Sequence, residues 1–218
     1  MTLQPFLQSA EFIDSDSPSI RSYARESLRA GNSQREQAID LYYRVRDGIR
    51  YTPYIDYSDP EMYRASSVLE KGYGFCGSKA SLLAACGRVL KIPSRVAFGD
   101  VKNHMNSPKL RKINNGDIMR WHAFTELYLE GRWVKATPAF NRELCTRFRI
   151  KSLEFDGRED SIFHPYDTNN HRHMEYLRMR GSFADIPFAE IIATYRKCSP
   201  GLLGDNSSGD FSTDAEIV

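Results

Sequence analysis

The chain has 218 residues, 41% of them hydrophobic, so it can bury a sizeable core within one globular domain. Its 30 basic and 28 acidic side chains leave a formal net charge of +2, which gives no electrostatic basis for binding nucleic acid or an anionic membrane. No stretch approaches the roughly 18 apolar residues of a membrane span, and the first residues, MTLQPFLQSAEF, lack the pattern of a signal peptide. We therefore expect a cytoplasmic protein with free cysteines at Cys76, Cys86, Cys145 and Cys198.

Two helices are predicted after a strand-poor arm over residues 1–17. Ser17 and Pro18 are typical of a helix start. Apolar residues then recur at helical spacing at Ile20, Tyr23, Ala24 and Leu28. Ser33 can cap a second helix, whose apolar stripe runs to Val45. The aromatic segment that follows, GIRYTPYIDYSDP, contains prolines and predicts extended chain and loop.

A glycine-rich loop, GYGFCG, leads into a third predicted helix over residues 76–91. The helix has a buried apolar stripe formed by Leu82, Leu83, Cys86, Val89 and Leu90. Pro93 ends it, and SRVAFGDV at 94–101 predicts a strand. Residues 103–118 are polar and contain the turn sequence INNGD, so we interpret them as a surface loop.

The segment WHAFTELYLEGRWVKATPAF predicts a β-hairpin. Its hydrophobicity alternates, and Glu-Gly at 130–131 stands where a tight turn is needed. A two-residue turn places Leu129 opposite Arg132. Continuing this ladder puts His122 on the same face as Thr137, its diagonal neighbour.

The region after the hairpin is charged and has no clear period, until FAEIIATYRK at 188–197 suggests a last short helix. Residues 199–218 have no Lys or Arg and are rich in Gly, Ser and Asp, so we expect a disordered tail. The order of elements indicates an α+β fold. We expect a single domain over 1–198, with a core at about 20–141 and an extension over 142–198.

Cys76 lies where the glycine-rich loop becomes a helix. The partial positive charge of a helix N-terminus favours a thiolate, and its unpaired N–H groups can face a developing oxyanion. Gly72, Gly74 and Gly77 allow tight turns and close approach of a substrate. The alternative is a small buried residue beside a turn. Cys86 is such a residue, because it lies in the apolar stripe.

A nucleophilic cysteine needs a base, normally a histidine. Four of the five histidines lie in polar or charged segments: His104, His164, His171 and His173. A metal site built from His164, His171, His173 and Cys145 is a minor alternative. It lacks a second ligand pair at metal-binding spacing, so we expect no metal and no organic cofactor. His122 differs because it opens a hairpin strand, where the alternative is a surface histidine.

These segments together resemble the transglutaminase-like superfamily, a branch of the papain-like cysteine enzymes, in a bacterial-type, single-domain form. The matching stretches are GYGFCGSKASLLAACGRVLKIPSRVAFG and WHAFTELYLEGRWVKATPAFN, with AIDLYYRVRDGIRYTPY upstream. The resemblance implies that Cys76 begins the nucleophile helix and that His122 lies on the adjoining strand. It also implies a core in which the N-terminal helices and the nucleophile helix pack on an antiparallel sheet.

The sequence departs from the family at one position. The family places an Asp after the Trp-Val strand, where it orients the imidazole and stabilises the imidazolium. Here Thr137 stands in its place. The group that orients His122 could be Thr137 itself, Asn141 (papain-like enzymes use Asn in this role), or an acid from elsewhere such as Asp100 or Asp156.

The resemblance implies a cysteine-dependent acyl-transfer enzyme. Cys76 would attack an amide or thioester carbonyl, and His122 would move the proton. Tyr51 or Tyr54 could aid the oxyanion, or could simply pack beside the core. Water or an amine would resolve the acyl-enzyme, giving a protease or amidase, or an amide-forming acyltransferase. The expected partners are a peptide or small-molecule acyl donor and an amine acceptor or carrier protein, without nucleic acid or membrane. A catalytically silent binding or scaffold domain of the same fold is the alternative.

Overall fold

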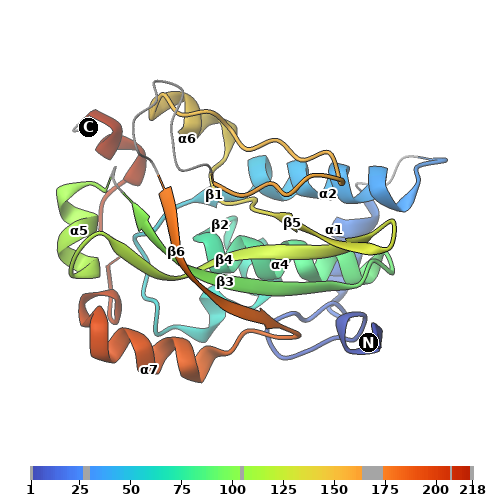
Figure 1. The fold of residues 1–218 in the computed structure, drawn as a ribbon, viewed down its shortest axis with the longest axis horizontal. Coiled ribbons are helices and arrows are strands. Elements are labelled where there is room, and N and C mark those ends of the chain that lie inside the picture. Colours follow the sequence, from blue (N-terminus) through green and yellow to red (C-terminus); the bar gives the residue numbers. More distant parts are fainter. Residues whose placement is uncertain (1, 27–29, 104–105, 164–173, 207, 217–218) are drawn as a thin grey trace.

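An antiparallel sheet of four strands, in the order β5-β4-β3-β6, forms one layer of the fold (Figure 1). The computed structural model describes residues 2–26, 30–103, 106–163, 174–206 and 208–216. The strands are β3 (Ser94–Asn103), β4 (Ile118–Leu129), β5 (Arg132–Ala136) and β6 (Met174–Phe183). A separate parallel pair consists of β1 (Arg50–Tyr51) and β2 (Tyr73–Gly74).

Helix α4 is the centre of the second layer. It packs on β3 and β4, and three other helices, α1, α2 and α3, pack around it. The α-helices are α1 (Pro18–Glu26), α2 (Gln34–Gly48), α3 (Ala65–Lys71), α4 (Cys76–Val89), α5 (Pro108–Asn114), α6 (Arg142–Arg147) and α7 (Phe188–Cys198). Short 3-10 helices lie at η1 (Gln4–Phe6), η2 (Pro60–Met62), η3 (Pro200–Leu202) and η4 (Phe211–Glu216). The α+β fold is therefore confirmed.

Local sequence signals explain the elements that were predicted. Ser33 caps α2 as expected, and its backbone N–H donates to the Glu36 carboxylate at 2.8 Å, completing a capping box. In the hairpin, Glu130 and Gly131 have φ values of 48° and 88°, as a tight two-residue turn requires. Leu129 pairs with Arg132, so the predicted register is confirmed.

The prediction of a surface loop over residues 103–118 was wrong in its centre, where α5 forms. The Ser107 hydroxyl accepts from the Leu110 N–H at 3.2 Å, and Pro108 occupies the first helical turn. This is the same Ser-Pro start signal that begins α1. The helix ends at Asn115 in a left-handed conformation, within the turn that INNGD predicted.

The C-terminal part differs most from expectation. Helix α7 forms as predicted, but β6 and α6 had no clear pattern in the sequence. The segment 199–218, for which we expected disorder, has two buried apolar side chains in its described part. Leu202 and Phe211 are buried, and the Phe211 ring packs on Tyr51 at 5.7 Å and on Phe148 at 5.1 Å. The buried side chains of Leu202 and Phe211 therefore hold this mostly polar C-terminal segment against the fold.

Within the described residues, no helix is both long enough and apolar enough to cross a membrane.

A buried arginine on α4 holds distant segments together. Arg88 is 2% exposed and donates to the carbonyl oxygens of Gln8 at 2.5 Å, of Ser94 at 2.9 Å and of Ala184. These carbonyls belong to the N-terminal arm, the start of β3 and the segment after β6. The single side chain therefore ties the N-terminal arm and the segment after β6 to the central helix.

We predict that Arg88→Met lowers the free energy of unfolding by about 3 kcal/mol, because it leaves three carbonyl groups without their donor. The matched control is Arg111→Met, which removes an exposed arginine paired with Asp117 at 2.7 Å and should cost no more than about 1 kcal/mol. Urea denaturation followed by circular dichroism measures both. Equal losses in the two variants would contradict the role given to Arg88.

Candidate active site

Cys76 is the first residue of α4 and is 4% exposed. The preceding Phe75 occupies the N-cap position, where its side chain offers no hydrogen-bond acceptor. The backbone N–H groups of Ala123, Gly77 and Cys76 itself face the sulfur and lower the pKa of the thiol. Two of these donors, the N–H groups of Cys76 and Gly77, belong to the start of α4, and the third, from Ala123, belongs to β4.

The expected ease of ionisation is not found. Burial outweighs these donors and raises the pKa of Cys76 to about 11. Cys86, which lies in the core as predicted, also has its pKa raised by burial, to about 12. Both thiols are therefore neutral near pH 7. They differ in their surroundings, because Cys76 lines a cavity whereas Cys86 is packed in the core.

The glycines around Cys76 serve the packing of the loop. Gly72 has a φ of 69° and ends α3, which is the expected turn. A Cβ at Gly74 would lie 2.4 Å from the Cβ of Ser78, and one at Gly77 would lie 2.6 Å from the Phe75 ring. The close approach at these two positions is therefore made by the chain itself rather than by a substrate.

His122 on β4 lines the same cavity as Cys76. The cavity holds about 20 Å³, and Trp121, Tyr195 and Leu202 contribute to its walls. His122 is 4% exposed, and burial lowers the pKa of its imidazole to about 4, without a compensating carboxylate. Near neutral pH the site therefore pairs a neutral thiol with a neutral imidazole.

A β-bulge sets the backbone just before His122. His122 pairs with Gly99, but Val101 pairs with Met119, so β4 has one extra residue there. Trp121 in the bulge has a φ of 58°, a conformation that is uncommon for a bulky residue. Its N–H donates to the Asp100 carboxylate at 3.2 Å.

Asp100 was one candidate for orienting His122, and the structure gives it a different task. Arg180 holds its carboxylate through two hydrogen bonds of 2.6 and 2.9 Å. The same guanidinium lies 4.5 Å from the centre of the Trp121 ring. Asp100 and Arg180 therefore stabilise the bulge that aims His122, instead of binding the imidazole.

Two further candidates are engaged elsewhere. The Asn141 side-chain oxygen accepts from the Tyr51 N–H at 3.3 Å. The Asp156 carboxylate accepts from the backbone N–H groups of Arg158 and Glu159, each at 2.8 Å, within its own loop. Neither arrangement directs the side chain to His122.

Thr137 is 1% exposed and follows β5 directly. Its carbonyl accepts from the Tyr42 hydroxyl at 3.1 Å, and its N–H donates to Ser161 at 3.0 Å, so the backbone is fixed. Its hydroxyl has no hydrogen-bond partner among the described residues. Of the proposed orienting groups, Thr137 is the one that the structure leaves available.

Sequence reasoning missed Tyr176 on β6, whose ring lies 6.1 Å from the His122 ring. No pattern in the charged segment around it indicated a strand. Among the described residues, six buried side-chain nitrogen or oxygen atoms have no hydrogen-bond partner. Four of them belong to this region: Trp121 Nε1, His122 Nε2, Thr137 Oγ1 and the Tyr176 hydroxyl. Such a cluster is unusual, because buried polar atoms are normally paired.

The two tyrosines considered for the oxyanion lie in different surroundings. Tyr51 is buried, and burial is the main reason that the pKa of its phenol is raised. A negative charge on the Cys76 thiol raises this pKa further, which indicates that the two side chains lie near each other. The Tyr54 hydroxyl lies 3.3 Å from the Ser107 hydroxyl, at the start of α5.

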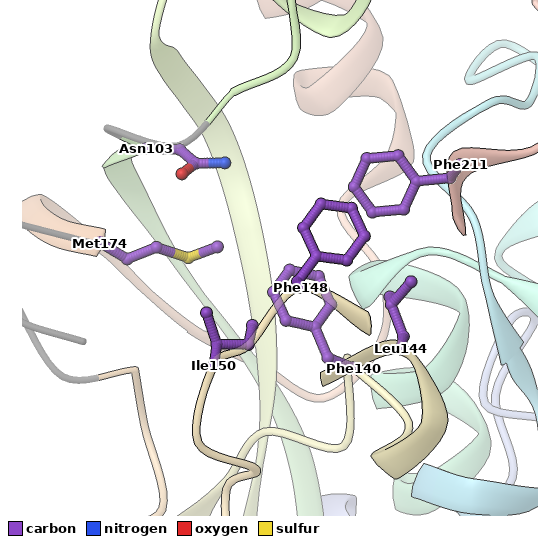
Figure 2. Close-up of a pocket in the computed structure, with 7 residues that line it drawn as sticks. All are labelled: Asn103, Phe140, Leu144, Phe148, Ile150, Met174 and Phe211. Carbon is purple, nitrogen blue, oxygen red and sulfur yellow. The ribbon is translucent and has the colours of Figure 1, made fainter. Parts of the chain in front are cut away.

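A second cavity of about 20 Å³ is lined mostly by apolar side chains, among them Phe140, Phe148 and Phe211 (Figure 2). Phe140 packs on Tyr51 at 4.7 Å and on Phe163 at 5.1 Å, and Phe163 in turn packs on His122 at 5.3 Å. A continuous set of aromatic rings therefore joins this cavity to the imidazole.

The metal alternative has no support in the described part of the chain, which contains no cluster of three or more metal-binding side chains. His104, His164, His171 and His173 lie outside the described residues. Cys145 is a buried free thiol on α6, as expected of a reduced cysteine.

The depressed pKa of His122 predicts a pH dependence of stability. Below pH 6.5 the unfolded chain binds a proton at this imidazole, whereas the folded chain excludes it until about pH 4. The contribution is complete above pH 6.5, falls as the pH drops, and amounts to about 3 kcal/mol at most. His122→Gln, which cannot titrate, should lose correspondingly less stability between neutral pH and pH 4 in urea denaturation. Identical losses would show that the fold does not lower the pKa of His122.

Comparison with known proteins places this geometry in a family. The family model of the transglutaminase-like superfamily matches residues 21–138. A candidate cysteine protease from Cytophaga hutchinsonii is 21% identical, with a TM-score of 0.47, over 62% of this chain and 41% of that one. A candidate protease from Parabacteroides distasonis ATCC 8503 is 14% identical, with a TM-score of 0.39, over 62% of this chain and 25% of that one.

The chain therefore spans less than half the length of either of these two proteins. No curated protein sequence matches it. The family model covers more than half of the 218 residues and contains both Cys76 and His122. The chain belongs to the transglutaminase-like superfamily.

Proposed function

We propose that the chain is a cysteine-dependent acyl-transfer enzyme, in which Cys76 attacks an amide or thioester carbonyl and His122 moves the proton. The observation that carries this proposal is the shared cavity. It brings together a thiol at a helix N-terminus and an uncharged imidazole, in a family whose fold is shown.

The neutral pair favours a general-base mechanism. As the sulfur attacks the carbonyl carbon, the thiol proton passes to the imidazole, which is free to accept it. The carbonyl oxygen becomes an oxyanion, for which the N–H groups at the start of α4 are donors. Trp121 lines the same cavity, and we propose its buried Nε1–H, which has no partner among the described residues, as a further donor.

The second half of the reaction uses the same groups. The imidazolium protonates the leaving amine or thiol, and a thioester remains on Cys76. Water or an amine then attacks this thioester, with His122 again as the base. Hydrolysis makes the enzyme a protease or amidase, and aminolysis makes it an amide-forming acyltransferase. We propose a peptide or small-molecule acyl donor, with an amine or a carrier protein as acceptor.

Access to the thiol requires a movement of the cavity wall. A space of about 20 Å³ accommodates little more than one water molecule. Leu110 of α5, and Tyr195 and Leu202 near the C-terminus, line it. An acyl group therefore reaches Cys76 only when one of these side chains is displaced.

A catalytically silent binding domain is the second candidate, and two observations favour it. Thr137 stands where the family carries an acid, and the pKa of Cys76 is raised rather than lowered. In that case the imidazole would contribute nothing to the reactivity of the thiol. The two candidates therefore differ in what removal of His122 does.

We predict that His122→Ala slows iodoacetamide alkylation of Cys76 at least about tenfold, because the thiol loses its base. Peptide mapping by mass spectrometry assigns the label. The matched control is Leu202→Ala, which enlarges the same cavity but keeps the base and should accelerate labelling. If His122→Ala also accelerates labelling, the thiol is merely buried and the enzyme proposal fails.

We also predict that Thr137→Asp raises the pKa of His122 by about 1–3, because it places a carboxylate beside the imidazole. An NMR titration of the imidazole measures this, with Thr137→Asn as the uncharged control. Alkylation of Cys76 near neutral pH should rise in parallel. An unchanged His122 pKa would mean that side chain 137 does not face the imidazole.

A further inference from the structure

Strand β6 brings a side chain to the active site from outside the family core. The family model ends at residue 138, whereas β6 begins at Met174 and pairs with β3 at the edge of the sheet (Figure 1, orange). Two irregularities in its pairing, near Gly99 and Val101, give β6 extra residues at this point. Tyr176 lies next to the second of these.

The Tyr176 ring packs against the sheet over Gly99, beside His122 and Phe124. Gly99 on β3 pairs with His122, and a Cβ at position 99 would lie 3.0 Å from the Tyr176 ring. The ring centre lies 6.1 Å from that of His122 and 6.2 Å from that of Phe124. A side chain larger than glycine at position 99 would require the Tyr176 ring to shift.

Three polar atoms around the Tyr176 ring are buried and have no hydrogen-bond partner among the described residues: His122 Nε2, Thr137 Oγ1 and the Tyr176 hydroxyl. The Thr137 hydroxyl approaches closely enough to lower the pKa of Tyr176, which burial otherwise raises. Even so, these two hydroxyls do not meet the geometry of a hydrogen bond. Leaving them unpaired is costly, so small rotations that join them are favourable.

We propose that Tyr176 is a positioning residue that, together with Thr137, replaces the family's acid in orienting His122. In this arrangement His122 Nε2–H donates to Thr137 Oγ1, and the Thr137 hydroxyl donates to the Tyr176 oxygen. The other imidazole nitrogen, Nδ1, is then the base for the Cys76 thiol. When the thiol proton reaches Nδ1, the oriented hydroxyl dipoles stabilise the imidazolium without a carboxylate.

This inference rests on the proposed function and names the groups that support its base. It explains how Thr137 can stand in the position of an Asp, because one hydroxyl is held by a second. It also assigns a task to the extension beyond the family core. Asp100 and Arg180 fix the backbone before His122, and Tyr176 fixes its ring from the same edge of the sheet.

The test is Tyr176→Phe, which keeps the ring on Gly99 and removes only the hydroxyl. Alkylation of Cys76 should slow about three- to tenfold, the effect of one neutral hydrogen bond. Two-dimensional NMR of the ¹⁵N-labelled imidazole should show less of the Nε2–H tautomer. The matched control is Tyr128→Phe, which removes a hydroxyl at the hairpin end of β4 and should change neither readout.

Two combinations distinguish positioning from a structural effect. Thr137→Val should slow alkylation, and adding Tyr176→Phe should slow it little further, because both act through one hydrogen-bonded chain. In a Thr137→Asp background Tyr176→Phe should become harmless, because a carboxylate orients the imidazole by itself.

Failure of this inference is separable from failure of the proposed function. If His122→Ala slows labelling but Tyr176→Phe behaves like Tyr128→Phe in rate and tautomer, the inference is wrong and the enzyme proposal stands. If His122→Ala does not slow labelling, both fall. Additive effects of Thr137→Val and Tyr176→Phe would also overturn the inference.

Discussion

The burial of Cys76 and His122 in one small cavity, without a neighbouring carboxylate, is the constraint on which the site depends. Burial disfavours charge on both groups, so the thiol and the imidazole are each neutral at physiological pH. A resting thiolate–imidazolium pair is therefore disfavoured. In the proposed reaction, charge has to develop as the thiol attacks, and the surrounding dipoles have to be in place before it does.

Rigid elements supply those dipoles. Helix α4 packs on the sheet and is surrounded by three other helices, so its N-terminus is fixed relative to β4. The bulge at Trp121 aims His122, and an Asp100–Arg180 pair holds that bulge. The two strands that flank β3 therefore both help to position the His122 imidazole: β4 carries His122 and the bulge, and β6 carries Arg180. The edge strand β6 belongs to the extension, so in the arrangement that we propose the extension completes the site.

The sequence predicted the parts of the site that depend on local chemistry. The loop that leads to Cys76, the start of α4 and the hairpin register followed from glycine positions, helix periodicity and a two-residue Glu-Gly turn. The helix α5 was missed because polar composition was given more weight than the Ser107-Pro108 start signal. The strand β6 and the anchors Leu202 and Phe211 depend on tertiary contacts that no local pattern encodes. The pKa of Cys76 was misjudged because a helix dipole is visible in the sequence, whereas the depth of burial is not.

The central claim is that Cys76 can carry an acyl group, and covalent trapping tests it most directly. Intact-mass spectrometry after brief incubation with p-nitrophenyl acetate, followed by peptide mapping, would locate any acetyl group. We predict a single acetyl thioester on Cys76 that is absent from Cys76→Ala and accumulates more slowly in His122→Ala. Acetylation spread over the other cysteines, or none at Cys76, would contradict it.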